Sequence, residues 1–154
     1  MSPVPKFTAF IQASGVGGLA QTLRAARIAS DTLVIHDVDP AVQRLCLRYG
    51  AREKIYVPGV TPGAYATDAF HDWILLLQPG EELSDDAVNA LKDWRHIRDD
   101  PSPGYLVRCR DDHRLQLRLV NRALVSWLGE FPPIPTNAGV FPGLIARAES
   151  LRAA

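Results

Sequence analysis

Glutamates stand at several positions where a protein can use a carboxylate as a general base. Glu81 and Glu82 follow a proline–glycine turn, and Glu130 lies between Gly129 and a proline-rich segment. A carboxylate placed in this way can take a proton from an attacking hydroxyl group. The simpler interpretation is a solvated acid at a loop or helix start, and spacing alone assembles no nucleophile–base pair. Glu81 and Glu130 are therefore the candidate catalytic residues.

Anion binding is a second chemistry, offered by arginines in and beside a predicted β-hairpin: Arg108, Arg110, Arg114 and Arg118. Guanidinium groups on one face of a hairpin can neutralise a diphosphate without a metal ion. We predict that Arg114 and Arg118 fill this role. The competing interpretation, which the pattern favours, is a solvated sheet face with Asp111 and Asp112 nearby. The 4 histidines show no metal-ligand spacing, so we predict no metal site.

The segment of residues 72–84 is the element most able to position such groups. Its apolar run, residues 73–77, predicts a short strand that is buried on both faces of a mostly parallel sheet. A proline–glycine turn ends this strand, and Ser84 caps the helix that follows. Because the ligands of open α/β sheets bind at the carboxyl ends of the strands, we expect the site at residues 78–81.

The rest of the chain alternates predicted strands and helices with short links. Strands are expected at residues 7–11, 32–36 and 54–57, and helices after residue 18, from Asp39 and from Ser84. An antiparallel hairpin over residues 105–121 and a short amphipathic helix around residues 144–151 follow. We therefore predict a single α/β domain over residues 1–154. Its three layers are a mostly parallel sheet with helices on both faces, and the antiparallel hairpin trails at the C-terminal end.

Composition and overall charge favour none of several classes of partner. The 17 basic and 17 acidic side chains balance, so no net charge argues for nucleic acid or for an anionic membrane. No apolar run is long enough to span a bilayer, and the N-terminus has no charged-then-apolar signal. Cys46 and Cys109 lie among apolar neighbours, which predicts buried free thiols and a cytoplasmic location.

The segment Ala13-Ser14-Gly15-Val16-Gly17-Gly18 lies between a predicted strand and a predicted helix. It resembles the dinucleotide-binding fingerprint of Rossmann proteins, with Asp37 at the end of the next strand, where an acid binds the ribose. The resemblance implies a small dinucleotide-binding module that uses Gly15, Gly18 and Asp37. However, Ala13 stands at the position of the first fingerprint glycine, and a glycine-rich turn is common in any strand–turn–helix unit.

A longer resemblance covers nearly the whole chain. The segments that carry it are residues 31–37, 48–51, 72–77, 81–84, 104–105 and 116–119, Arg122, and Trp127-Leu128-Gly129. Their order and spacing resemble the family-2 glycosyltransferases, which have the nucleotide-sugar-binding α/β fold called GT-A. The resemblance implies a GT-A-like, Rossmann-like domain with a nucleotide sugar as partner. The nucleotide-binding residues that it implies are Ser14, Gly15, Asp37, Asp39, Gln78 and Gly80.

The chain departs from this family at positions that carry its chemistry. The family follows the strand equivalent to residues 73–77 with an Asp-x-Asp segment that holds a divalent cation, and here those positions are Gln78 and Gly80. An amide and a glycine cannot replace carboxylate oxygens around a hard cation. The family often has a His-Glu pair after the Trp-x-Gly segment, whereas this chain has Pro132-Pro133. The first turn also lacks the family's Asn and Glu.

These departures lead to one main hypothesis and two alternatives. We predict a catalytically degenerate glycosyltransferase-like protein, without a cofactor, that retains nucleotide or sugar binding or serves as a partner-binding module. The first alternative is a metal-independent glycosyltransferase with Glu81 or Glu130 as its base. The second is the small Rossmann dinucleotide-binding protein. The sequence leaves a protein partner or a homo-oligomer open, and it identifies neither donor nor acceptor.

Overall fold

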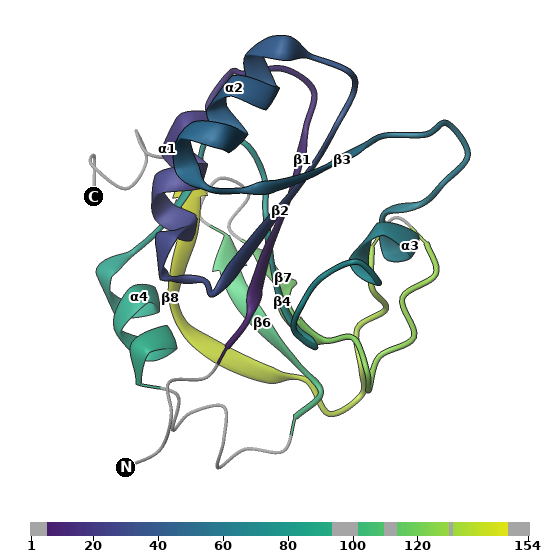
Figure 1. Ribbon diagram of the computed structural model, residues 1–154. Helices are drawn as coiled ribbons and strands as arrows, with labels where there is room; N and C mark the ends of the chain where they lie inside the picture. Colours follow the sequence, from purple (N-terminus) through teal and green to yellow (C-terminus); the bar gives the residue numbers. More distant parts are fainter. Residues whose placement is uncertain (1–5, 94–101, 110–113, 130, 148–154) are drawn as a thin grey trace.

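The computed structural model describes residues 6–93, 102–109, 114–129 and 131–147. One eight-stranded sheet runs through this part of the chain, with the strand order β3-β2-β1-β4-β7-β6-β8-β5 (Figure 1). Its strands are β1 (Thr8–Ala13), β2 (Asp31–His36), β3 (Arg52–Ile55), β4 (Trp73–Leu77), β5 (Glu81–Leu83), β6 (Gly104–Cys109), β7 (Arg114–Asn121) and β8 (Gly139–Arg147). The helices are α1 (Leu19–Ala25), the 3-10 helix η1 (Ala26–Ile28), α2 (Pro40–Tyr49), α3 (Pro62–Ala66) and α4 (Asp85–Lys92).

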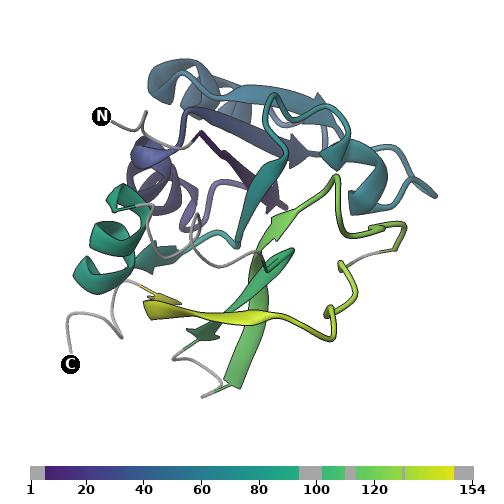
Figure 2. The same cartoon turned by 90° about the horizontal axis from the view of Figure 1, so that it is seen from below.

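The sheet joins a parallel part to a mixed part. Strands β3, β2, β1 and β4 run parallel to one another. Strand β7 then pairs antiparallel with β4, and β6 and β7 form the predicted antiparallel hairpin. Strand β8 runs parallel to β6, and β5 lies antiparallel to β8 at the other edge. The sheet is curled, so that β6, β7 and β8 turn away from the plane of β1, β2 and β4 (Figure 2). The fold is therefore mixed α/β.

Alternate side chains of the parallel strands enter two different hydrophobic cores, as the pleat of a strand requires. On one side, Ile11 packs in a cluster with buried residues of α1, α2 and α4: Leu19, Leu23, Val42, Cys46, Ala90 and Leu91. On the other side, Phe10 packs with buried residues of α3 and of the segment after β7: Tyr65, Ala66, Val125 and Trp127. Strands β1, β2 and β4 are thus covered on both sides, which explains their largely apolar sequences.

Local sequence rules set the ends of the helices. Asp39 caps α2 by accepting a hydrogen bond from the Ala41 amide at 2.9 Å, and Pro40 takes the first helical position. Gly50, with a φ of 69°, ends the same helix in the left-handed conformation. Ser84 accepts a hydrogen bond from an amide in the first turn of α4 at 3.3 Å. These contacts confirm the predicted starts of α2 and α4.

The predicted helix around residues 144–151 is wrong in its described part. Residues up to Arg147 belong to β8, where Ile145 pairs with Leu83 of β5 and with Cys109 of β6. Ile145 is 1% exposed, so pairing on both sides of the strand and burial outweigh the amphipathic helical pattern. The end of the predicted helix, residues 148–151, lies outside the described residues.

The third strand also differs from its prediction, because β3 covers Arg52–Ile55 rather than residues 54–57. Arg52 donates hydrogen bonds to Asp31 of the neighbouring β2, which fixes the start of β3 through a polar contact that apolar patterning does not detect. The turn of the predicted hairpin, residues 110–113, lies outside the described residues.

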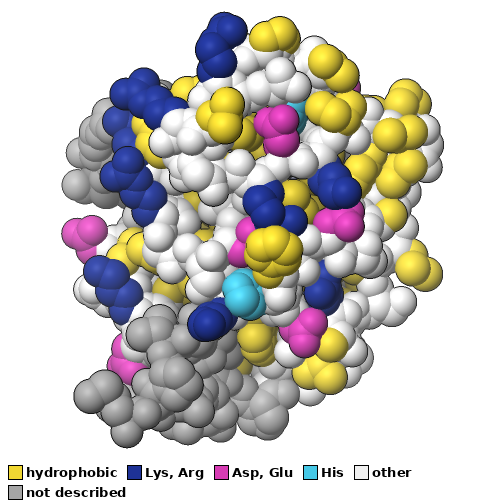
Figure 3. All heavy atoms as spheres, viewed as in Figure 1, with side chains coloured by type: hydrophobic (Ala, Val, Ile, Leu, Met, Phe, Trp, Pro, Cys, Tyr) yellow, Lys and Arg dark blue, Asp and Glu magenta, His cyan; other side chains and the backbone are white. Residues whose placement is uncertain are grey.

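The surface agrees with some of the compositional predictions. No helix in the described part of the chain is long and apolar enough to cross a membrane. Cys46 and Cys109 are buried and form no disulfide, which confirms the predicted thiols. Basic and acidic side chains both occupy the face seen in Figure 3, and basic ones lie over α1 and α2.

Candidate functional site

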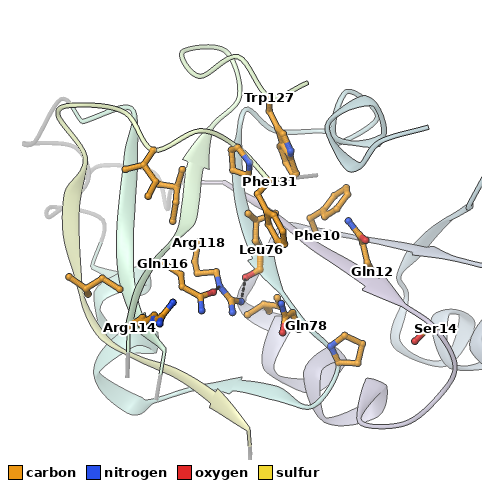
Figure 4. A pocket seen from close by; sticks show the side chains of 16 residues that line it. Phe10, Gln12, Ser14, Leu76, Gln78, Arg114, Gln116, Arg118, Trp127 and Phe131 are labelled. Carbon is orange, nitrogen blue, oxygen red and sulfur yellow. Dashed lines mark hydrogen bonds between the residues drawn. The ribbon is translucent and has the colours of Figure 1, made fainter. Parts of the chain in front are cut away.

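A cleft of about 850 Å³ opens beside the carboxyl ends of β1 and β4 (Figure 4). It is bounded by these two strands, by β7 and by the segment that follows β7. The residues that line it are Phe10, Gln12, Ser14, Leu76, Leu77, Gln78, Pro79, Arg114, Leu115, Gln116, Leu117, Arg118, Trp127, Phe131, Pro132 and Ile134. The cleft therefore lies at the sheet edge where parallel α/β proteins bind ligands, next to the predicted turn at residues 78–81.

One end of the cleft is polar and rich in amide groups. Gln12 and Ser14 reach it from the end of β1, Gln78 from the end of β4, and Gln116 from β7 (Figure 4). Gln12, Ser14 and Gln78 are exposed. A side-chain amide donates and accepts hydrogen bonds, so these groups suit a ligand with hydroxyl or carbonyl groups.

The other end of the cleft is aromatic. Phe10 packs edge-on against Trp127, with a distance of 5.5 Å between the ring centroids. Phe131 and Ile134 lie nearby on the segment after β7 and are 70% and 64% exposed (Figure 4). Exposed aromatic and aliphatic groups on the wall of a cleft can pack against the face of a ligand ring.

Arg118 and Glu81 form a buried ion pair beside the cleft. The distance from Arg118 Nη1 to Glu81 Oε1 is 2.6 Å and that from Nη2 to Oε2 is 2.9 Å, and the two side chains are 6% and 7% exposed. Arg118 also donates hydrogen bonds to the Leu76 carbonyl at 3.1 Å and to Gln116 at 3.0 Å. Glu81 accepts a further hydrogen bond from the backbone amide of Gln78 at 2.7 Å. The pair thus ties β7 to the end of β4 and fixes the turn that follows it.

The predicted arginine stripe does not form a single surface. Arg114 is exposed and lines the cleft. Arg118 also lines it but is 5% exposed, so the alternative of a solvated sheet face is wrong for this residue. Burial of a guanidinium requires a bound carboxylate, which β5 supplies. Arg108 is exposed and does not line the cleft, and Arg110 lies outside the described residues.

The candidate general bases have different surroundings. Both carboxylate oxygens of Glu81 are bound by the Arg118 guanidinium, and the side chain is not among those that line the cleft. Glu82 is partly exposed and does not line the cleft either. Glu130 lies outside the described residues. The described part of the cleft wall consequently offers no carboxylate that faces a ligand.

The residues predicted to bind a nucleotide are divided between the cleft and other places. Ser14 and Gln78 line the cleft, whereas Gly15 and Gly80 do not. Asp39 is occupied as the cap of α2. Asp37 is exposed beyond the end of β2 and is likewise not part of the cleft wall. Only some of this predicted set therefore meets at one site.

The glycine-rich turn before α1 packs against the turn after β4. A Cβ at Gly18 would lie 2.6 Å from the Gly80 amide nitrogen, and that amide donates a hydrogen bond to the Gly18 carbonyl at 3.0 Å. Thr22 donates hydrogen bonds to the carbonyls of Gln78 and Glu81 and holds the same contact from α1. Because the backbone of Gly80 fills this close approach, Gly18 serves packing, which argues against its role in the dinucleotide-binding interpretation.

The donor groups of the cleft do not fit a hard divalent cation. The lining residues supply amides, a hydroxyl and guanidinium groups, but no carboxylate, imidazole or thiol. Across the described ranges of the chain, no group of three or more His, Cys, Asp and Glu side chains could hold a metal ion. Magnesium and manganese require carboxylate oxygens, so the sequence departures at Gln78 and Gly80 are not compensated by acids from other described segments.

A second charged network lies at the amino end of β2, away from the cleft. Arg52 donates hydrogen bonds to both carboxylate oxygens of Asp31 at 2.8 and 2.7 Å, and its guanidinium lies 3.6 Å from the centre of the Phe70 ring. Burial alone would raise the pKa of Asp31, but hydrogen bonds from Arg52, the Phe70 amide and Thr8, with the charge of Arg52, hold it below its usual value. This network fixes β2, β3 and the segment after α3 to one another.

Several residues of the site were not predicted from sequence. Gln12 and Phe131 line the cleft, but nothing in their local sequence marks them as ligand-facing, and Gln116 was noted only as part of the family resemblance. Trp127 had a signal, because it begins the Trp-x-Gly segment of the family resemblance. Thr22 lies inside an amphipathic helix, where a polar side chain on the buried face is the only sign of its role.

No protein-family model matches the chain, and no curated protein matches it. Several solved structures, however, match the fold of the chain. TarS from S. aureus superposes with a TM-score of 0.53 at 11% identity, over 69% of this chain and 22% of that chain. A shorter TarS chain in complex with UDP-GlcNAc superposes with a TM-score of 0.50 at 13% identity, over 69% of this chain and 35% of that chain.

Glucosyl-3-phosphoglycerate synthase from Mycobacterium tuberculosis superposes with a TM-score of 0.52 at 9% identity, over 71% of this chain and 45% of that chain. The chain thus spans less than half of the length of each of these proteins. At such low identity the likeness concerns the fold alone. It agrees with the resemblance noted in the sequence: the chain has a GT-A-like α/β fold.

Proposed function

We propose that the cleft binds a nucleotide sugar without a divalent cation and that the chain does not transfer the sugar. One observation carries the proposal: the Glu81/Arg118 ion pair lies buried at the end of β4. In the family that the sequence resembles, this end of the sheet holds a cation. The GT-A-like fold supports a nucleotide sugar as the class of ligand, since a similar TarS chain is in complex with UDP-GlcNAc.

Electrostatics supports binding without a metal. A divalent cation beside Gln78 would meet the positive guanidinium of Arg118, whose partner Glu81 is already neutralised by it. The carboxylate of Glu81 is occupied by this pairing, and the exposed side-chain amide of Gln78 is a weak ligand for such an ion. The guanidinium therefore occupies the region in which an activated sugar would otherwise need a cation.

The wall of the cleft offers matching contacts for each part of a nucleotide sugar. In the proposed arrangement, Arg114 binds the diphosphate, because it is the exposed arginine of the cleft wall. Ser14 and Gln78 bind hydroxyl groups. Phe131 packs against the base or the sugar ring. No cation is needed for any of these contacts.

The described wall of the cleft offers no general base, which supports the absence of transfer. Glu81 is held by Arg118, and Pro132-Pro133 stands where the family resemblance places a His-Glu pair. An acceptor hydroxyl group would lose its proton too slowly without a positioned base, which typically contributes a factor of about 10² to 10⁴ in rate.

A fluorescence titration tests the binding. Trp127 lines the cleft, so UDP-GlcNAc added in the presence of EDTA should change its emission in a saturable way, and the change should be lost in Trp127→Phe. Arg114→Gln should weaken binding about tenfold, as expected for the loss of a charge-assisted hydrogen bond. Arg108→Gln is the matched control, because Arg108 is exposed and lies outside the cleft.

The two parts of the proposal fail in different ways. Equal affinity of the Arg114→Gln variant and the wild-type protein would contradict the assignment of the diphosphate to the cleft. Release of UDP from UDP-GlcNAc in the presence of sugar acceptors, abolished by Glu81→Gln, would contradict the absence of transfer.

A further inference from the structure

The outer surface of α1, η1 and α2 carries arginines and no carboxylate. Its exposed cations are Arg24, Arg27, Arg44 and Arg48. No aspartate or glutamate occurs in residues 14–30 or 40–50. Together with Leu47, these residues form a surface that we call the arginine face. Because the whole chain has a net charge of +0, this face is a local excess of positive charge.

The arginines of this face are neighbours in space. Arg44 and Arg48 are one turn apart on α2, so their side chains lie on the same side of the helix. The guanidinium groups of Arg27 and Arg48 lie 5.4 and 5.9 Å from the centre of the same ring, that of Tyr49, which joins the two helices. Figure 3 shows basic side chains over this part of the molecule.

Acidic groups near the arginine face do not neutralise it. None of its arginines forms an ion pair with a carboxylate in the described part of the chain. Asp39 and Asp37 lie at the opposite, N-terminal end of α2, and Asp39 is engaged as the helix cap. Arg24, Arg27 and Arg48 lie in the last turns of α1, η1 and α2, where a positive charge interacts favourably with the helix dipole. Arg44 does not lie in a last turn, so the dipole does not explain its presence.

The exposure of Leu47 indicates which kind of partner this face binds. It is 83% exposed, the most exposed of the large apolar side chains described, and it lies on α2 between Arg44 and Arg48. The buried side of the same helix already has its own apolar residues, Val42 and Cys46. A nucleic acid would gain little from an exposed leucine among arginines. A lipid surface can bind both kinds of side chain, because its phosphates contact the guanidinium groups and its apolar layer accommodates the leucine.

We propose that the arginine face binds the surface of an anionic lipid membrane. In this mode α2 lies in the plane of the interface, Leu47 enters the boundary between headgroups and acyl chains, and the arginines contact lipid phosphates. The cleft beside β4 takes no part in this contact, so the proposal does not depend on the nature of its ligand.

Sedimentation with lipid vesicles tests this surface. The full chain should bind vesicles of phosphatidylcholine with about 30% phosphatidylglycerol and should not bind pure phosphatidylcholine. Arg44→Gln/Arg48→Gln should weaken binding about 25-fold, since one arginine near an anionic surface contributes about a fivefold change in affinity. Lys92→Gln/Arg108→Gln removes the same charge from exposed positions elsewhere and should change binding by less than about twofold.

A second variant separates a membrane from a soluble polyanion. Leu47→Ser should weaken vesicle binding about tenfold while leaving binding to duplex DNA or heparin unchanged, because only a lipid layer takes up the leucine. The thermal midpoint of each variant should match that of the wild-type protein, because the substituted side chains are exposed.

Other results would overturn the proposal. These are no binding to anionic vesicles at low salt, equal binding to neutral vesicles, and equal loss in the two double variants. Tighter binding to duplex DNA than to vesicles, unaffected by Leu47→Ser, would assign the face to nucleic acid instead.

Discussion

Arg118 and Glu81 face each other, and each Nη atom of the guanidinium donates a hydrogen bond to one carboxylate oxygen, although the two residues are 37 positions apart in the chain. Arg118 comes from β7 and Glu81 from β5, and between them they hold the turn that ends β4. This is the place where the sequence resemblance expects acids and a cation. The guanidinium of Arg118 lies there instead, paired with the carboxylate of Glu81.

The ion pair should make a large contribution to stability that depends on both partners. Glu81→Gln leaves a buried guanidinium without its charge partner and should lower the free energy of unfolding by about 3–5 kcal/mol in urea. The double variant Glu81→Gln/Arg118→Met should lose less than the sum of the two single losses. Asp72→Asn is the control, because its partner Arg122 is 3.4 Å away and Asp72 is 61% exposed, so that loss should be below about 1 kcal/mol. Additive single losses would show that the two residues act independently.

The contact between the turns before α1 and after β4 should tolerate no side chain at Gly18. Gly18→Ala places a Cβ 2.6 Å from the Gly80 nitrogen and forces a φ of 74° on alanine, so we expect a loss of about 2–3 kcal/mol. Gly17→Ala is the matched control, since its Cβ meets nothing within 4 Å and its φ is not positive. Urea unfolding of both variants measures the difference, and equal stabilities would contradict the packing role.

Asp31 should make the protein sensitive to acid. Its pKa is lower in the folded chain than in the unfolded one, so its contribution is complete above the unfolded value of about 4 and is lost as the pH falls through the folded value. Asp31→Asn should cost about 2 kcal/mol at pH 7, and the difference from the wild-type protein should shrink between pH 5 and pH 2. A difference that stays constant over this range would show that the charge of Asp31 is not responsible.

Cys46 should be chemically inert while the protein is folded. Burial, followed by the charge and a hydrogen bond of Glu53, raises the pKa of its thiol to about 11, and the residue is 1% exposed. At pH 8 only about one molecule in a thousand carries the reactive thiolate. Dithionitrobenzoate should therefore modify Cys46 slowly in buffer and both cysteines rapidly in denaturant. Fast modification of Cys46 in buffer would mean that α2 opens readily.

The parts of the fold that were predictable from sequence follow local rules. Asp39 and Gly50 bound α2 because a cap and a left-handed glycine act within a few residues of the helix ends. The apolar run of β4 marks a strand buried on both faces, wherever its neighbours lie. The alternation of β1, α1, β2 and α2 at the start of the chain was predictable for the same reason.

The parts that were not predictable depend on contacts between distant segments. Ile145 lies in a strand because β5 and β6 pair with it on either side, which no local pattern reports. Arg118 was assigned to an open face by the alternation of its strand, and only the position of Glu81 shows why it is buried. The aromatic end of the cleft likewise joins Phe10 of β1 to Trp127, from opposite ends of the chain.

Isothermal titration of UDP-GlcNAc into the protein, in EDTA and in manganese, distinguishes binding without a cation from cation-dependent binding. We expect a saturable heat with the same dissociation constant, within about twofold, in both buffers, because the exposed Arg114 supplies the positive charge that the diphosphate needs. Binding in manganese that disappears on chelation would contradict the account, since it would require a cation site that the described cleft wall does not provide.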